Sequence, residues 1–296
     1  MPDVVAVVGP TAAGKSEAAL RIAERLHGEV VNADSMQLYR GMDVGTAKLT
    51  QDERRGVPHH LLDVWDVTVT ANVATYQALA RDALDRLRQN GRTAVLVGGS
   101  GLYVRAALDA LEFPGTNAAI RERLEAEGAA HGPDALHARL SGLDPVAAQR
   151  IGPANVRRTV RALEVIELTG RPFSEGPGME TYAASVYDTS YVGIAPEMAT
   201  LDERIEARVD EMWERGLVAE VAHLAEAGLR DGVTARRALG YQQVLAFLDG
   251  ATTEEHAREH TKQATRRFAR RQLSWFRRDP RIAWFDQAAG AVAAAT

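Results

Sequence analysis

Short apolar runs and segments of helical periodicity alternate through the N-terminal part of the chain. Three runs rich in valine lie at Val4–Val8, Glu29–Asn32 and 94–97. Short β-branched runs that end in glycine or turn residues are typical of buried strands in a parallel sheet. Between them, apolar residues recur every three or four positions over 15–27 and 73–89, which predicts helices. This alternation predicts an α/β fold, a parallel sheet core flanked by helices.

The pattern changes after Pro114-Gly115. Helical periodicity then continues from 118 to about 168, and a loop rich in Gly, Ser and Pro follows. We therefore expect a mostly helical insertion domain over 114–186. The α/β core would consist of residues 1–113 and 187–296.

The C-terminal part returns to strands and helices. A strand is expected at 191–195, and an apolar stripe at helical spacing runs from Leu201 to Leu224. A long helix is expected at about 253–278, followed by a short strand at 282–285. These segments complete the predicted core.

Composition places the chain among ordinary globular proteins. Hydrophobic residues make up 46% and charged residues 25%, which excludes disorder of the whole chain. The chain has 0 cysteines, which excludes disulfides, thiolate nucleophiles and cysteine zinc sites. No apolar run approaches the roughly 18 residues of a membrane span. The start carries no basic segment of a secretory signal, so we expect a cytoplasmic protein without a membrane partner.

A phosphate-binding loop follows the first predicted strand. Its residues match G-x-x-x-x-G-K-[ST] and are Gly9, Pro10, Thr11, Ala12, Ala13, Gly14, Lys15 and Ser16. The glycines allow successive backbone N–H groups to face a phosphate, and the following helix presents its positive end. Lys15 adds a charge, and Ser16 can hold Mg²⁺. The sequence therefore predicts binding of a phosphate or diphosphate.

The third predicted strand lacks the acid that ATP-hydrolysing loops use to position Mg²⁺, because it runs into Gly98-Gly99-Ser100. An acid instead follows the second strand, at Asp34. Ligands bind at the carboxyl edge of open parallel sheets, so Asp34 is a candidate base beside the loop. A turn aspartate is the alternative.

Basic residues gather in two segments. Between Thr261 and Arg281 there are eight basic residues and one acid, in a chain of net charge −5. The second group is Arg157, Arg158 and Arg161. Guanidinium groups pair with phosphates, so two such groups favour a nucleic-acid partner over simple solvated faces. Adjacent side chains rarely share one ion, so His59 and His60 favour no metal site.

Taken together, the motifs resemble the tRNA dimethylallyltransferase family, also called isopentenyl-tRNA transferases. They run in family order across nearly the whole chain and comprise the phosphate loop, Ala33-Asp34-Ser35-Met36-Gln37-Leu38-Tyr39-Arg40, Met42-Asp43-Val44-Gly45-Thr46-Ala47-Lys48, Pro58-His59-His60-Leu61-Leu62-Asp63, Gly98-Gly99-Ser100-Gly101-Leu102-Tyr103, Arg161-Ala162-Leu163-Glu164-Val165, Gly240-Tyr241 and Arg270-Arg271-Gln272-Leu273-Ser274-Trp275-Phe276. The resemblance implies a P-loop NTPase-like core.

The resemblance also implies a reaction. The family moves a dimethylallyl group from dimethylallyl diphosphate to N6 of adenosine 37 in tRNAs that read codons beginning with U. The loop would then hold the donor's diphosphate together with Mg²⁺, and Asp34 would be the base. Thr11 and Lys15 would lie at the reacting centre. A later helix supplies an arginine to the diphosphate, and we favour Arg204 over Arg208.

Further residues match tRNA contacts of the family. They are Asp34, Ser35, Met36, Gln37, Ser100, Arg121, Arg157, Arg158 and Arg161. The helical insertion would clasp the anticodon stem-loop, and we expect a monomer. Three departures are visible: Ser100 replaces a common threonine, Leu49 replaces a usual proline, and 66–77 is a loose match.

Two other functions compete with this hypothesis. A phosphate-loop kinase would use ATP and Asp34, but the missing acid and the basic helix argue against it. A nucleic-acid-binding module with a vestigial loop would bind tRNA without turnover. Transfer of a labelled dimethylallyl group to unmodified tRNA would support the first hypothesis. Transfer of a γ-phosphate without prenylation would support the kinase, and tRNA binding without turnover or diphosphate binding would support the module.

Overall fold

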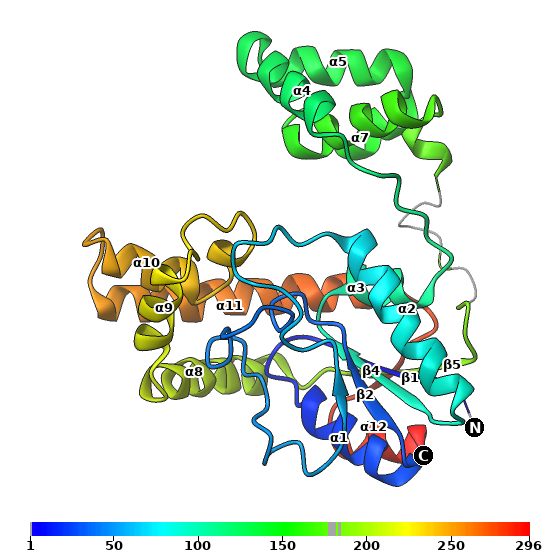
Figure 1. Ribbon diagram of the computed structural model, residues 1–296, viewed down its shortest axis with the longest axis vertical. Helices are drawn as coiled ribbons and strands as arrows, with labels where there is room; N and C mark the ends of the chain where they lie inside the picture. The colour runs from blue at the N-terminus through cyan, green and yellow to red at the C-terminus, as the bar shows by residue number, and fades with distance from the viewer. Residues whose placement is uncertain (1, 177–181, 183–184) are drawn as a thin grey trace. The chain divides into compact units, whose positions relative to one another are not determined.

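The computed structural model describes residues 2–176, 182 and 185–296. The chain forms two compact units (Figure 1). One comprises Met1–Asp109 and Ser185–Thr296, and the other comprises Ala110–Ala184. The first unit contains the sheet and the phosphate loop.

The sheet has six parallel strands in the order β3-β2-β4-β1-β5-β6. The strands are β1 (Val4–Val8), β2 (Glu29–Asn32), β3 (His59–His60), β4 (Ala94–Gly98), β5 (Thr189–Ile194) and β6 (Ala283–Phe285). In the centre, Val5 of β1 lies beside Val95 of β4 and Ser190 of β5. A central parallel strand is covered on both faces, which explains why β1 is wholly apolar and buried. The predicted parallel α/β core is confirmed.

Helices cover both faces of the sheet and continue beyond it. They are α1 (Lys15–Leu26), α2 (Val73–Gln89), α3 (Gly101–Leu108), α8 (Met198–Glu214), α9 (Leu217–Glu226), α10 (Tyr241–Leu248), α11 (Glu254–Phe276) and α12 (Ala288–Ala295), with a 3₁₀ turn η2 (Ala235–Arg237). On one face α1 and α12 join the sheet in a single buried cluster that includes Val5, Ile22 and Val292. On the other face α2 and α3 pack against each other and against β4 (Figure 1). Helix α11 contacts both α8 and α10.

The chain of the first unit breaks off at Asp109 and resumes at Ser185, and these two ends lie side by side. The N–H of Val186 donates to the carbonyl of Leu108 over 2.8 Å. Asp109 and Ser185 form an antiparallel bridge, and the buried Asp109 carboxylate pairs with Arg281 at 2.7 Å. The two ends of the interruption are therefore fixed to each other within the first unit.

The second unit is a small helical bundle, and it comprises Ala110–Ala184 where the sequence analysis expected 114–186. Its helices are α4 (Ala118–His131), α5 (Pro133–Leu143), α6 (Pro145–Ile151) and α7 (Val156–Thr169), followed by the 3₁₀ turn η1 (Phe173–Glu175). Leu124, Leu136 and Leu163 lie in its buried cluster. Asp144 caps α6 by accepting from the N–H of Ala147, and it also accepts from Ser174. Such caps satisfy N–H groups that the first helical turn leaves free.

Two features depart from the sequence reading. The apolar stripe of 201–224 divides into α8 and α9 at Gly216, whose φ of +92° is typical of glycine at a helix boundary. A short edge strand, β3, forms at His59–His60. The His60 Nε2 lies 2.7 Å from Glu29, and the His59 Nδ1 lies 2.8 Å from the carbonyl of Val57. Among the described residues, no helix is long and apolar enough to cross a membrane.

Candidate functional site

The phosphate loop joins β1 to α1 at the carboxyl edge of the sheet. Gly9 has a φ of +142°, and a Cβ there would lie 2.3 Å from the carbonyl oxygen of Ile194 in β5. Gly14 has a φ of +91°, and α1 begins at the next residue. Both positions therefore require glycine, and together they curl the loop so that α1 points its N-terminus at the cavity.

Two cations meet at this loop. The Nζ of Lys15 donates to the carbonyl of Pro10 at 2.6 Å, and the Nη1 of Arg208 donates to the Oγ1 of Thr11 at 3.3 Å. Desolvation and the charge of Arg208 lower the pKa of Lys15 to about 7, although Asp34 acts in the opposite direction. Desolvation also lowers the pKa of Arg208, against the attraction of Glu211 and Asp34. An anion at the loop would relieve the mutual repulsion of these cations.

The structure favours Arg208 over Arg204, the residue that the sequence analysis preferred. Arg204 is exposed on α8, whereas Arg208 is half-buried and contacts Thr11. The two residues are one helical turn apart, so their spacing alone gives them the same face. The packing of α8 beside the loop decides which one reaches the site.

A cavity of about 450 Å³ opens at the loop. Its lining includes the side chains of Lys15, Ser16 and Arg208. Apolar Leu20 and Leu49 and the carboxylates of Asp52 and Glu53 complete much of the rest. The described residues contain no cluster of three or more His, Asp or Glu that could hold a metal ion. Ser16, which the sequence analysis predicts to hold Mg²⁺, lines this cavity.

Asp34 follows β2 in a tight turn. Its Oδ1 accepts from the N–H of Met36 at 2.9 Å, while its own N–H donates to Asn32 at 2.8 Å. Asn32 in turn donates to the carbonyl of Leu61 at 3.0 Å. Asp34 therefore is a turn aspartate, the alternative considered from the sequence, but this role uses only one carboxylate oxygen. Within the described chain, Oδ2 has no hydrogen-bond partner.

Buried tyrosines flank Asp34. The rings of Tyr76 and Tyr103 lie 4.5 Å apart, and the Tyr76 hydroxyl donates to the carbonyl of Asn32 at 3.0 Å. Burial, together with nearby negative charge, raises the pKa of both hydroxyls, so they remain protonated near neutral pH. They provide a rigid, largely apolar wall beside the carboxylate.

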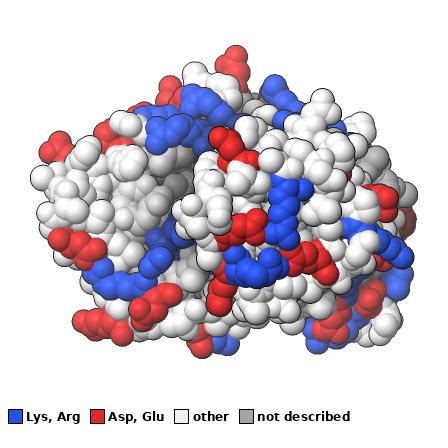
Figure 2. Space-filling view, turned by 90° about the horizontal axis from the view of Figure 1, so that it is seen from above, with Lys and Arg blue, Asp and Glu red and all other residues white. Residues whose placement is uncertain are grey.

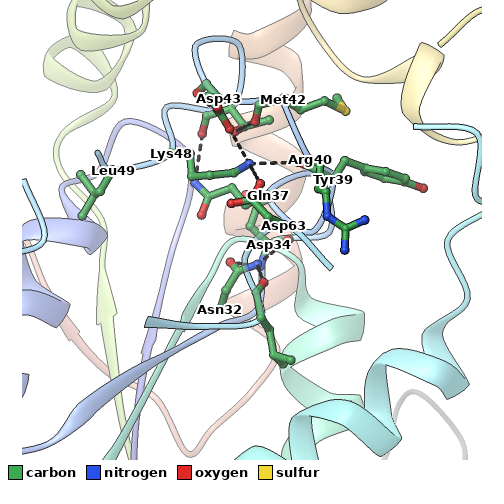
Figure 3. A network of polar contacts seen from close by, with 12 residues as sticks. Asn32, Asp34, Gln37, Tyr39, Arg40, Met42, Asp43, Lys48, Leu49 and Asp63 are labelled. Atoms are coloured by element: carbon green, nitrogen blue, oxygen red, sulfur yellow. Dashed lines mark hydrogen bonds and ion pairs between the residues drawn. The ribbon is translucent and has the colours of Figure 1, made fainter. Parts of the chain in front are cut away.

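A polar network holds the segment after Asp34 (Figure 3). The buried ammonium of Lys48 donates to the carbonyl of Tyr39 and to the carboxylates of Asp43 and Asp63, at 2.6–2.9 Å. Three acceptors satisfy all three protons of the ammonium. Since the two carboxylates come from separate loops, Lys48 ties these loops together.

Gln272 is a site residue that the sequence reading did not single out. Its Oε1 accepts from the N–H of Thr11 at 2.9 Å, and its Nε2 donates to the carbonyl of Gly99 at 2.8 Å. Gln272 therefore joins α11 to the phosphate loop and to the end of β4. A Cβ at Gly101 would lie 1.8 Å from Trp275, so the glycines after β4 let α11 approach this closely. The signal in the sequence was a polar residue on the apolar face of the helix.

Acids of α8 pair with three of the eight basic residues of 261–281. Arg266 pairs with Glu206, Arg270 pairs with Asp202 at 2.7 Å, and Lys262 pairs with Asp210 at 2.7 Å. Figure 2 shows Lys and Arg interleaved with Asp and Glu over the face that it presents. Together with the Arg281–Asp109 pair, these contacts give four of the eight basic residues of 261–281 an acidic partner within the chain. Phe276 is buried and therefore does not contribute to an exposed surface of the helix.

In the second unit, two of the predicted tRNA-binding arginines are engaged internally. Arg121 and Arg161 both pair with the buried carboxylate of Glu164, at 2.7 and 2.8 Å. Burial acts to raise the pKa of Glu164, but the hydrogen bonds from these arginines prevail and lower it. Arg157 and Arg158, in the first turn of α7, are exposed and have no ion-pair partner among the described residues.

Comparisons with known proteins agree across the chain. A family model described as IPP transferase matches residues 37–279. The chain is 63% identical over 289 residues to a tRNA dimethylallyltransferase of Streptomyces avermitilis, covering 97% of this chain and 91% of the relative. It is also 63% identical over 289 residues to one of Thermobifida fusca, covering 96% and 90%.

Solved structures show the same likeness. The full-length tRNA isopentenylpyrophosphate transferase of Bacillus halodurans is 42% identical with a TM-score of 0.70, covering 96% of this chain and 90% of that chain. A eukaryotic dimethylallyltransferase acting on tRNA is 26% identical with a TM-score of 0.82, covering 96% and 73%.

Proposed function

The chain belongs to the IPP transferase family and has tRNA dimethylallyltransferase activity, and from this premise we propose which of its residues perform the transfer. We infer that the acceptor is N6 of adenosine 37 and the donor is dimethylallyl diphosphate. The observation that carries the proposal is the meeting of Lys15 and Arg208 at the phosphate loop, within electrostatic range of Asp34.

The loop and its two cations bind the diphosphate in this proposal. The reaction breaks the bond between C1 of the dimethylallyl group and the diphosphate oxygen, so negative charge grows on the departing oxygen. Backbone N–H groups of residues 12–16, Lys15 and Arg208 stabilise this charge, and the two cations are already in place before the reaction. Thr11 orients Arg208 through its hydroxyl.

Asp34 acts as the base. The N6 lone pair forms the new bond to C1, and one N6 proton passes to Oδ2 of Asp34. Oδ1 is held by the N–H of Met36, which fixes the carboxylate orientation. The Tyr76–Tyr103 wall keeps water from the reacting atoms on that side.

A magnesium ion fits this site when it is held mainly by the donor. Ser16 supplies one hydroxyl at the cavity, and the described residues offer no carboxylate cluster for a closed metal site. Magnesium would then arrive with the diphosphate, keep several water ligands and neutralise part of the diphosphate charge.

The tRNA partner is recognised at two places. The target base leaves the anticodon-loop stack to reach Asp34, where Ser35, Met36 and Gln37 line the turn and Ser100 immediately precedes α3. The exposed Arg157 and Arg158 bind phosphates of the anticodon stem-loop, whereas Arg121 and Arg161 support them by fixing the start of α4 to α7.

The decisive experiment incubates the protein with dimethylallyl diphosphate, Mg²⁺ and unmodified tRNA. Mass analysis of digested nucleosides should show N6-(dimethylallyl)adenosine in the wild type. An Asp34→Asn variant should keep tRNA binding but lose about 10²- to 10⁴-fold in turnover, the usual contribution of a general base. Near-normal turnover of this variant would remove Asp34 as the base.

A further inference from the structure

A carboxylate from α9 accepts hydrogen bonds from the loop that follows residues 34–37, the turn that we propose receives the target base. The loop consists of residues 42–48, and Glu220 lies in the first turn of α9. Three consecutive backbone N–H groups donate to this carboxylate: those of Asp43 at 3.1 Å, Val44 at 2.7 Å and Gly45 at 3.1 Å. Successive N–H groups that converge in this way form a site for an anion, and Glu220 supplies the anion from within the chain.

A tyrosine donates a fourth hydrogen bond to the Glu220 carboxylate. The hydroxyl of the fully buried Tyr241 donates to Glu220 Oε1 at 2.6 Å. A Cβ at Gly45 would lie 2.5 Å from the Tyr241 ring and 2.8 Å from Leu217, so the backbone of the 42–48 loop rests directly on these side chains. Burial and the Glu220 charge raise the pKa of Tyr241, which keeps its hydroxyl as a donor.

The same loop holds Gln37 from its other side. The Nε2 of Gln37 donates to the carbonyl of Thr46 at 3.1 Å. A carbonyl accepts only from the amide NH₂, so this bond fixes which end of the Gln37 amide faces the loop. The Oε1 of Gln37 has no partner within the described chain, and it is left to accept a hydrogen bond from a ligand.

We propose that Glu220 is a positioning residue for tRNA: by fixing the 42–48 loop, it holds Gln37 with Oε1 presented to the target adenosine. This inference rests on the proposed function. Glu220 touches neither substrate, and its influence passes through the backbone of residues 43–46 to the Gln37 amide. Lys48 ties the same loop to Asp63 independently, so a change of Glu220 should shift the backbone of residues 43–46 without unfolding the loop.

The test compares Glu220→Gln with Glu226→Gln, an exposed position at the end of the same helix. The Glu220→Gln change places an amide NH₂ group against backbone N–H donors. We expect Kd and KM for tRNA to rise about tenfold, which corresponds to the loss of one charged hydrogen bond. KM for dimethylallyl diphosphate, kcat at saturating tRNA and the far-UV spectrum should stay at wild-type values, and Glu226→Gln should match the wild type throughout.

A double-mutant cycle with Gln37→Ala tests the route. If Glu220 acts through Gln37, Glu220→Gln should add less than about twofold in the Gln37→Ala background. Full additivity, an equal rise in donor KM, or unchanged tRNA affinity would overturn the inference. A wild-type protein that makes no prenylated adenosine would instead overturn the proposed function, so the two failures are distinguishable.

Discussion

Arg208 on α8 and Thr11 in the phosphate loop share a hydrogen bond of 3.3 Å, although 197 positions separate them along the chain. Helix α8 thereby brings a second cation to the phosphate loop, which already contains Lys15. A phosphate loop with one lysine suits many anions. The added guanidinium can contact two oxygens at once, which suits a diphosphate leaving group.

Replacement of Arg208 should damage the transfer, whereas replacement of Arg204 should not. Arg208→Ala should lower kcat/KM for dimethylallyl diphosphate by roughly 10²- to 10³-fold, the usual effect of removing one donor to a developing negative charge. Arg204→Ala should stay within about twofold because its side chain is exposed. Steady-state prenylation of tRNA measures both. Equal losses in the two variants would contradict the assignment.

Diphosphate binding should take up a proton at Lys15. With a pKa of about 7, Lys15 is mostly neutral at about pH 8.5 in the empty protein, and a bound anion raises its pKa. Titration calorimetry with diphosphate in buffers of different ionisation enthalpy counts this proton. Lys15→Met should take up nearly one proton fewer than the wild type, and Lys262→Met, whose lysine pairs with Asp210, should not differ.

The same lysine gives a signed stability profile for the empty protein. Its folded pKa of about 7 lies below the ordinary 10.5, so the unfolded chain binds more protons between these values. Lys15 should therefore make unfolding free energy rise with pH from about 7 to 10.5, with no slope below 7. Denaturant unfolding at several pH values should show this slope in the wild type and not in Lys15→Met.

Gln272→Leu should loosen the phosphate loop. The change leaves the N–H of Thr11 and the carbonyl of Gly99 without partners, which should lower the unfolding free energy by about 1–3 kcal/mol. Diphosphate affinity should fall because Thr11 is no longer held. Gln263→Leu on the exposed side of α11 is the matched control. Wild-type affinity in Gln272→Leu would show that the loop keeps its shape without α11.

Neutralising Arg157 and Arg158 should flatten the salt dependence of tRNA binding. Each lost phosphate contact should reduce the slope of log K against log salt by about 0.7–0.9. The control replaces Arg86 and Arg215, which pair with acids four residues earlier on their helices. An unchanged slope in Arg157→Gln/Arg158→Gln would remove these arginines from the interface.

The parts predictable from sequence were those fixed by local pattern. The phosphate loop could be placed because a strand, two glycines and a helix are contiguous. Asp34 could be placed because strand ends share one edge of a parallel sheet.

Tertiary packing determines which of the remaining residues reach the site, and the sequence does not show this packing. Arg204 and Arg208 have the same helical face, and only the approach of α8 to the loop separates them. Glu220 lies 176 positions beyond Val44 in the loop that it holds, so no spacing could have linked them. Arg161 and Glu164 did carry a local signal, since side chains three apart on a helix meet.

The neighbouring positions of Leu108 and Val186 bear on how such a protein could have been assembled. The polypeptide leaves the sheet unit and returns to it at one hydrogen-bonded junction. The entropic cost of closing a loop grows only with the logarithm of its length, so a longer inserted segment should destabilise the sheet unit little. A module of helices could be gained, enlarged or exchanged there without disturbing the sheet unit. The helical unit and the sheet unit could thus have changed in length and sequence at separate rates.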